Sequence, residues 1–154
     1  MQVLYFAYGS NMSSKHFRLR ISSAKLIGSA YLKDKKMVFN KGSIDNSGKA
    51  NLVDSIGDVT WGVLYEIDAQ DFGRLDQIEG GYRRVQVRVF RSEGRGVNAV
   101  TYLSANLISE PVAYDWYKEL VISGAREHNL PQEYIAYLEQ LPSKPDRTQS
   151  GTVG

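Results

Sequence analysis

YRRVQVRVF, residues 82–90, is a regularly alternating stretch of the 154-residue chain. Valines occupy positions 85, 87 and 89, while arginine or glutamine occupies positions 84, 86 and 88. A period of two is typical of a β-strand with one buried face. A turn at residues 93–96 and a second apolar stretch at residues 97–103 follow, so we expect a hairpin here.

Other strand-like and helix-like segments surround this hairpin. Short apolar runs predict strands at residues 3–7, 25–32, 36–40 and 61–67, and a loop rich in Gly, Ser and Asn is expected at residues 40–51. We expect helices over residues 12–19, over residues 68–79 with Asp68 as the N-cap, from Pro111 to about residue 128, and from Pro131 to residue 141. Strands that come first and helices that come last favour an α+β fold over an alternating parallel sheet. We therefore expect a small mixed β-barrel of about five to seven strands with flanking helices.

Length and charge restrict the other possibilities. The chain is long enough for one domain, which we assign to residues 1–141, whereas residues 142–154 have little apolar content and are expected to form a disordered tail. The net charge of +2 does not indicate a nucleic-acid or membrane partner. The N-terminal sequence lacks the pattern of a signal peptide, and no stretch is long enough to span a membrane, so we expect a cytoplasmic protein.

The available reactive side chains limit the chemistry. The chain has no Cys and only two His, His16 and His128, which lie far apart in the sequence. These residues predict no metal site and no thiol nucleophile. A Ser-His-Asp arrangement is possible in principle, but no G-x-S-x-G motif is present. Any catalysis is therefore expected to depend on carboxylates, hydroxyls and backbone groups, without a cofactor.

YFAYGSN, residues 5–11, is a candidate binding segment. An apolar strand ends here at Gly-Ser-Asn, and a helix is expected to follow. Such a turn can present successive backbone N–H groups to an anion or oxyanion. The simpler alternative is an ordinary strand–turn–helix connection, because Gly, Ser and Asn are common turn residues.

Glu79 is a candidate catalytic residue. It follows Ile78 and precedes Gly80-Gly81, at the expected C-terminal end of a helix, where the helix dipole disfavours negative charge. A partly buried carboxyl at this position would have a raised pKa and could exchange protons near neutral pH. The alternative is that Glu79 is exposed and has no function.

Three segments resemble the γ-glutamyl cyclotransferase family, in this order and at this spacing: YFAYGSN (5–11), LDQIEGGY (75–82) and YKELVISGAREHNLPQEYIAYL (117–138). WGVLYEID (61–68) also matches the strand that leads into the family's acidic helix. The resemblance covers roughly residues 3–141. It implies a small β-barrel with surrounding helices and a cofactor-free reaction, in which a γ-glutamyl amide forms 5-oxoproline and releases its amine. Asn11 points to the classical branch of the superfamily and not to the glutathione-specific one, whose loop has an apolar residue after Gly-Ser.

The resemblance also implies roles for individual residues. Glu79 matches the general acid/base, and Tyr117 matches a tyrosine that contacts the substrate. Tyr82 lies near a further family tyrosine, although the intervening loop is shorter here than in the animal enzymes. The opening strand and loop are expected to line the substrate pocket through Tyr5, Phe6, Ala7, Tyr8, Gly9, Ser10 and Asn11.

The identity of the leaving amine is left open. One alternative is the same chemistry on a γ-glutamyl amine or a γ-glutamyl-protected intermediate, and another is a non-catalytic relative that binds small ligands. Arg83 and Arg84 could bind a carboxylate on the leaving group, although a solvated strand end is the simpler interpretation. The expected partner is a small γ-glutamyl substrate, with no nucleic acid or membrane, and a homodimer is possible.

Overall fold

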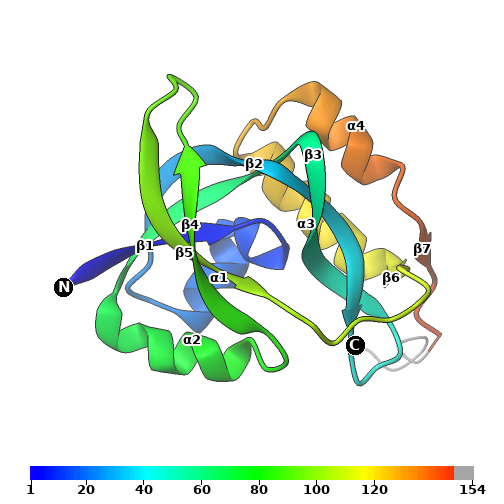
Figure 1. Cartoon of the computed structure of the whole chain (residues 1–154). Coiled ribbons are helices and arrows are strands. Elements are labelled where there is room, and N and C mark those ends of the chain that lie inside the picture. The colour runs from blue at the N-terminus through cyan, green and yellow to red at the C-terminus, as the bar shows by residue number, and fades with distance from the viewer. Residues whose placement is uncertain (148–154) are drawn as a thin grey trace.

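The computed structural model describes residues 1–147. Five strands form a closed barrel in the order β1-β3-β2-β4-β5 (Figure 1). Their bounds are Gln2–Ala7 for β1, Lys25–Gly42 for β2, Gly48–Asp68 for β3, Arg83–Phe90 for β4 and Gly96–Leu103 for β5. Neighbouring strands are antiparallel except β1 and β5, which are parallel and close the barrel where Tyr5 pairs with Val100. The predicted mixed barrel and the predicted β4–β5 hairpin are both confirmed.

The long β2–β3 hairpin differs from the prediction. The two strands expected at residues 25–32 and 36–40 form one continuous strand, with a register shift around Asp34. The predicted loop over residues 40–51 is shorter than expected and covers residues 43–47, because β2 extends to Gly42 and pairs with β3 from Gly48 onward. A Cβ on Gly48 would lie 1.8 Å from the Phe39 carbonyl oxygen. This glycine therefore supports close pairing of the strands, although its local composition is typical of a loop.

Short helices follow two of the strands. The 3₁₀ helix η1 (Ser10–Met12) and helix α1 (Ser14–Arg20) come directly after β1, and the hydroxyl of Ser13 caps α1 by accepting the N–H of His16. The 3₁₀ helix η2 (Ala69–Asp71) and helix α2 (Phe72–Ile78) come after β3. The predicted N-cap role of Asp68 is wrong, since its side chain makes no capping hydrogen bond and accepts one from Gln2 instead.

The C-terminal part packs against the barrel through helix α3 (Asp115–Glu127) and helix α4 (Gln132–Glu139). The helix predicted from Pro111 begins later, because Ala113–Tyr114 forms strand β6. Helix α3 lies against η1, where a Cβ on Gly124 would lie 2.7 Å from the backbone nitrogen of Ser13. This close approach holds the loop after β1 against a rigid helix, which positions the candidate site.

Ordered structure continues past the predicted domain boundary at residue 141. Strand β7 (Ser143–Lys144) pairs in parallel with β6, so the first part of the predicted disordered tail is a strand. The rest of that prediction, residues 148–154, lies outside the described residues. No helix in residues 1–147 has the length and apolar composition needed to cross a membrane, and α3, the longest, has 13 residues.

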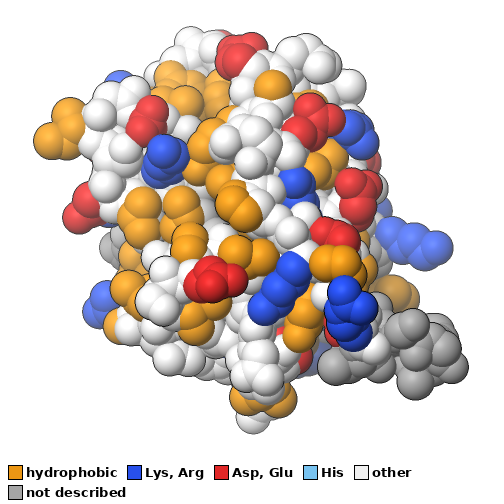
Figure 2. Space-filling view, turned by 90° about the vertical axis from the view of Figure 1, so that its right-hand side faces the viewer, with side chains coloured by type: hydrophobic (Ala, Val, Ile, Leu, Met, Phe, Trp, Pro, Cys, Tyr) orange, Lys and Arg blue, Asp and Glu red, His pale blue; other side chains and the backbone are white. Residues whose placement is uncertain are grey.

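One face of the molecule carries α4 and β7 (Figure 1). Figure 2 shows acidic and basic side chains interspersed on this face, with apolar side chains between them. The described part of this face therefore has no continuous basic stripe of the kind that binds a nucleic-acid backbone.

Candidate active site

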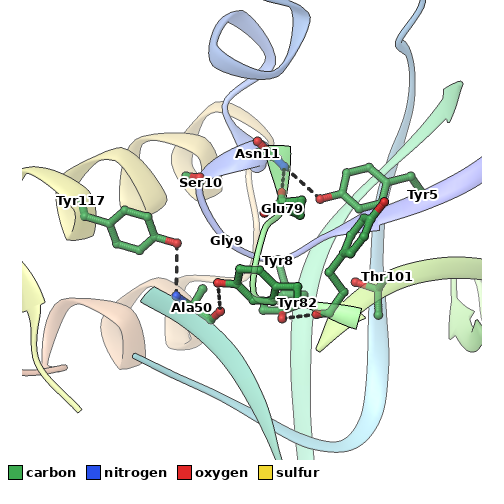
Figure 3. A pocket seen from close by; sticks show the side chains of 11 residues that line it. Tyr5, Tyr8, Gly9, Ser10, Asn11, Ala50, Glu79, Tyr82, Thr101 and Tyr117 are labelled. Atoms are coloured by element: carbon green, nitrogen blue, oxygen red, sulfur yellow. Dashed lines mark hydrogen bonds between the residues drawn. The ribbon is translucent and has the colours of Figure 1, made fainter. Parts of the chain in front are cut away.

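The candidate site lies where β1 ends, between residues of β1, β3, β5 and α3 (Figure 3). We call it the inner pocket; its volume is about 30 Å³, and it is lined by Tyr5, Tyr8, Gly9, Ser10, Asn11, Ala50, Glu79, Tyr82, Thr101, Tyr102 and Tyr117. Eight of these residues were predicted to act in the site, although they come from three distant parts of the sequence. The pocket is narrow, with room for little more than one water molecule.

Phe6 and Ala7 were also predicted to line the site, and they do not lie among the residues that line the inner pocket. Both side chains are buried in the core. The backbone of Phe6 still has a role, since its carbonyl oxygen accepts a 2.7 Å hydrogen bond from the hydroxyl of Thr101. These two residues therefore act through packing and backbone bonding.

The backbone of Ala50 is a site component that the sequence did not indicate. Its N–H donates to the Tyr117 hydroxyl at 3.1 Å, and its carbonyl accepts from the Tyr82 hydroxyl at 2.6 Å (Figure 3). Because Ala50 acts through its main chain, no residue type at this position could have revealed the role. Thr101 and Tyr102 were missed as well, since residues 97–103 were predicted only as a strand.

Glu79 lies at the C-terminal end of α2, as predicted, and its N–H donates to the Leu75 carbonyl at 2.8 Å. The side-chain nitrogen of Asn11 donates to Oε1 of Glu79 at 2.7 Å and to the hydroxyl of Tyr5 at 3.0 Å. Figure 3 shows Asn11 between these two acceptors. The Asn11 amide therefore holds the carboxylate in a defined position in the pocket.

The environment of Glu79 favours its protonated form. Burial raises the pKa of the Glu79 carboxyl above its ordinary value. The Arg20 charge, the Asn11 hydrogen bond and the Lys41 charge act in the opposite direction, in decreasing order. Within residues 1–147, Glu79 forms no ion pair. The predicted rise in pKa therefore agrees with the structure, but burial is its main cause.

Tyr117 offers a hydrogen-bond donor to the pocket. Its oxygen accepts the N–H of Ala50 and also interacts with the hydroxyl of Ser10. The contact with Ala50 uses the Tyr117 oxygen as an acceptor, so this contact does not occupy the hydroxyl hydrogen. Burial raises the pKa of Tyr117 to about 12, so this hydroxyl stays protonated at neutral pH.

The loop after β1 was predicted to present backbone N–H donors to a ligand. Among the described residues, no acceptor is assigned to the N–H groups of Gly9, Ser10 or Asn11. Gly9 has a φ of −113° and a ψ of −136°. A Cβ there would lie 2.9 Å from the Cβ of Ala50 and 3.4 Å from the Tyr117 hydroxyl. Glycine is therefore needed because β3 and Tyr117 pack closely against this loop.

A larger cavity of about 470 Å³ adjoins the inner pocket, and we call it the outer chamber. The two share a wall formed by Ser10, Glu79, Tyr82 and Tyr117. Three basic side chains also line the outer chamber: Arg20, Lys41 and Lys49. The sequence did not identify this group. By contrast, Arg84 lies 3.7 Å from Asp76 and over the ring of Phe72, and it does not line either cavity.

A second group of polar residues, Ser14, His128 and Glu127, resembles a nucleophilic triad in composition only. Nε2 of His128 lies 3.2 Å from the Ser14 hydroxyl and 2.9 Å from the carbonyl oxygen of Met12. A carbonyl only accepts hydrogen bonds, so Nε2 carries a hydrogen and cannot take the proton of Ser14. Elsewhere in residues 1–147, no group of three or more His, Asp or Glu side chains is arranged to hold a metal ion.

Comparisons with known proteins identify the family and agree with the fold. Residues 59–138 match the AIG2-like family. A γ-glutamylcyclotransferase from Homo sapiens is 35% identical over 147 residues, which cover 90% of this chain and 78% of the human protein. The chain belongs to the AIG2-like γ-glutamylcyclotransferase family. It is therefore an enzyme with γ-glutamylcyclotransferase function.

The solved structures extend the comparison to the fold. A structure described as a γ-glutamyl cyclotransferase superposes on this family member with a TM-score of 0.88 at 32% identity, covering 100% of this chain and 94% of the other. A yeast structure described as a γ-glutamyl cyclotransferase specific to glutathione has a TM-score of 0.65 at 14% identity, covering 89% and 93%. The yeast protein therefore shares the fold, and nothing more follows from the likeness.

Proposed function

We propose that this chain converts γ-glutamyl amides, either γ-glutamyl amino acids or γ-glutamyl amines, into 5-oxoproline and the free amine. Glu79 acts first as the general base and then as the general acid. The observation that carries the proposal is a half-buried carboxyl with a raised pKa, held in the pocket by the side-chain amide of Asn11. A carboxyl in this environment can act as the base that accepts the proton and as the acid that returns it.

The reaction needs no nucleophile from the protein. The α-amine of the substrate attacks the γ-carbonyl carbon, so a C–N bond forms and closes a five-membered ring. The amide C–N bond then breaks. Glu79 takes the proton from the α-ammonium group and delivers it to the departing nitrogen, so no water is consumed and no oxygen enters the product. Holding amine and carbonyl together in one site supplies much of the rate enhancement.

The oxygen of the γ-carbonyl gains negative charge as the ring closes. Two kinds of donor support its stabilisation: the unpaired backbone N–H groups of residues 9–11 and the hydroxyl of Tyr117. One donor of this kind is worth about 3 kcal/mol in the transition state. The loop could instead hold the α-carboxylate of the glutamyl group, because that role requires the same donors.

The proposed substrate contacts follow the inner pocket. Tyr5, Tyr8, Gly9, Ser10, Asn11, Tyr82 and Tyr117 are proposed to face the glutamyl group. The reaction is proposed to need no metal or cofactor, because the substrate supplies the nucleophile and Glu79 moves the proton. Dialysis against a strong chelator is expected to leave the rate unchanged, and a loss restored by a divalent ion would contradict this part of the proposal.

The test compares three compounds: a γ-glutamyl amide, its α-linked isomer and the N-acetylated γ-linked form. The protein should release 5-oxoproline from the first compound alone. The α-linked isomer would have to close a three-membered ring, and acetylation removes the nucleophile. In isotopically labelled water the product should contain no solvent oxygen. Glutamate as the first product, or labelled oxygen in it, would indicate hydrolysis and overturn the proposal.

A binding protein without catalysis is the alternative from another functional class. A pocket that only binds an acidic ligand gains nothing from a buried carboxyl, because Glu79 would repel the ligand. The presence of Glu79 beside Asn11 therefore favours the enzyme.

Location and assembly can be tested directly. We expect the protein in the cytoplasm, which cell fractionation would test. A homodimer is possible, and light scattering of the purified protein would show its oligomeric state.

A further inference from the structure

We propose that the outer chamber binds a carboxylate carried by the leaving amine, and that Lys41 is its main contact. The inference rests on the proposed function, and it makes Lys41 a specificity-determining residue for the proposed reaction. It follows from the charges of the chamber, the position of Lys41 and the direction in which the leaving group must depart.

The charges of the chamber are unbalanced. Lys49 is already paired, since its ammonium lies 3.0 Å from a carboxylate oxygen of Asp45 and 3.0 Å from the Ser47 hydroxyl. Lys41 and Arg20 form no ion pair with any residue of the range 1–147. Glu79 is the acidic residue that lines the same chamber. Two cations thus face one carboxyl whose ionisation is disfavoured by burial.

Lys41 is held close to the reacting groups. Its ammonium lies 5.2 Å from the centre of the Tyr82 ring. A Cβ on Gly81 would lie 3.0 Å from Nζ of Lys41, so the ammonium lies against the backbone two residues after Glu79. Burial and the charge of Lys49 lower the pKa of Lys41, while Glu79 and Asp45 oppose this shift. A partly buried cation without a partner anion favours binding of an anion from solution.

The direction of departure brings the leaving group to Lys41. Glu79 returns its proton to the leaving nitrogen, so that nitrogen must lie beside Glu79, in the wall shared by the inner pocket and the outer chamber. The narrow inner pocket leaves the chamber as the space for the rest of the amine. In an α-amino acid, the carboxylate is separated from the nitrogen by one carbon atom. It would therefore enter the chamber next to Lys41.

Two substrates that differ by one group test the proposal: γ-glutamyl-alanine and γ-glutamyl-ethylamide, which lacks the leaving-group carboxylate. The ratio of their kcat/KM values measures recognition of that carboxylate. Lys41→Met keeps most of the apolar stem and removes the charge. In Lys41→Met we expect kcat/KM for γ-glutamyl-alanine to fall about tenfold or more relative to kcat/KM for γ-glutamyl-ethylamide. This is the size of effect expected for the loss of one charge-assisted contact. Lys25→Met, an exposed lysine on the same strand, should leave the ratio unchanged.

Three outcomes would overturn the proposal. An equal loss for both substrates would place Lys41 at the α-carboxylate, which both compounds carry. An equal fall of the ratio in Lys25→Met would show that the overall positive charge of the protein, and not a contact with Lys41, recognises the carboxylate. An unchanged ratio in Lys41→Met would show no contact at all.

A binding measurement separates this proposal from the proposed function. Calorimetry on Glu79→Gln and on Glu79→Gln/Lys41→Met measures affinity without turnover. Adding Lys41→Met should weaken the binding of γ-glutamyl-alanine about tenfold more than the binding of γ-glutamyl-ethylamide. If the wild type releases 5-oxoproline from neither compound, the proposed function fails, and the calorimetry still decides whether Lys41 binds the carboxylate.

Discussion

The side-chain amide of Asn11 donates a 2.7 Å hydrogen bond to the carboxylate of Glu79, 68 residues away in the sequence. The same nitrogen donates to the hydroxyl of Tyr5, and the Asn11 oxygen lies 3.5 Å from a guanidinium nitrogen of Arg20. The proposed base is therefore positioned by a residue of the loop that is proposed to bind the substrate. One element thus orders both the proton-transfer group and the glutamyl group.

Glu79→Gln should reduce turnover by about 10²–10⁴-fold, because an amide neither accepts nor returns the proton. The shape of the side chain is almost unchanged, so substrate affinity measured by calorimetry should be kept or increased. Near-normal turnover would contradict the proposed role of Glu79.

The same substitution has a predicted effect on stability. The pKa of Glu79 in the folded protein lies above its ordinary value of 4.5. Between these two pKa values, Glu79 is more protonated in the folded protein than in the unfolded chain. Stability from this group is therefore lost as pH rises toward the folded-state pKa. Glu79→Gln should lack this contribution, and its melting temperature at pH 7 should equal or exceed that of the wild type. A clearly lower value would show that the carboxylate stabilises the fold.

Asn11→Ala should change the pH profile of kcat/KM. The hydrogen bond from Asn11 lowers the pKa of Glu79, so removing it should raise that pKa further. The base must be ionised to act, so the acidic limb of the profile should move to higher pH, with the largest loss of rate at low pH. Asn98→Ala, at an exposed position of β5, is the control. A uniform loss of rate with an unmoved acidic limb would show that Asn11 acts on the substrate and not through Glu79.

Tyr117→Phe should lower kcat/KM well below that of its control variant, while the two variants lose a similar amount of folding stability. The substitution removes the hydroxyl that is proposed to donate to the substrate, and it also leaves the Ala50 N–H without its partner. Tyr137→Phe is a matched control, since its hydroxyl donates to the Met37 carbonyl at 2.7 Å away from the pocket. Both variants should lose about 1 kcal/mol of stability. Equal activity in the two variants would show that the Tyr117 hydroxyl is structural.

Gly9→Ala should impair both activity and stability. The new Cβ would approach the Cβ of Ala50 to 2.9 Å, so the loop, β3 or both must shift. Ala50→Gly removes the opposing atom, and the double variant should recover much of the melting temperature and of kcat/KM. Measured as a double-mutant cycle, the two substitutions should be strongly coupled. Additive losses would show that the contact between the two residues is not what requires glycine.

Local sequence signals were sufficient for much of the fold. The alternation at residues 84–89 predicted β4, and the glycines after Glu79 predicted the end of α2. Gly81 has a φ of +88°, a left-handed conformation that favours glycine, so this signal has a direct physical cause. Glu79 was identified because its position relative to that helix end could be read from adjacent residues.

Other features were decided by contacts between distant segments. Residues 40–51 have a loop-like composition, yet most of them are strand, because β2 and β3 pair across the whole hairpin. The backbone of Ala50 binds two tyrosines without any contribution from its side chain. Phe6 and Ala7 were expected in the pocket and are core residues instead, because the end of β1 is covered on both faces, so that consecutive side chains are buried.

The sequence by itself determined the family, the mixed α+β barrel and the position of Glu79, because these depend on residue types and on their spacing along the chain. Only the tertiary structure decided that Asn11 contacts Glu79 and that Arg20, Lys41 and Lys49 line one chamber. Barrel closure and the packing of α3 against η1 bring these side chains together from separate elements. Burial of Glu79, which is the main cause of its raised pKa, is likewise produced by segments that surround it in space and not by its neighbours in the chain.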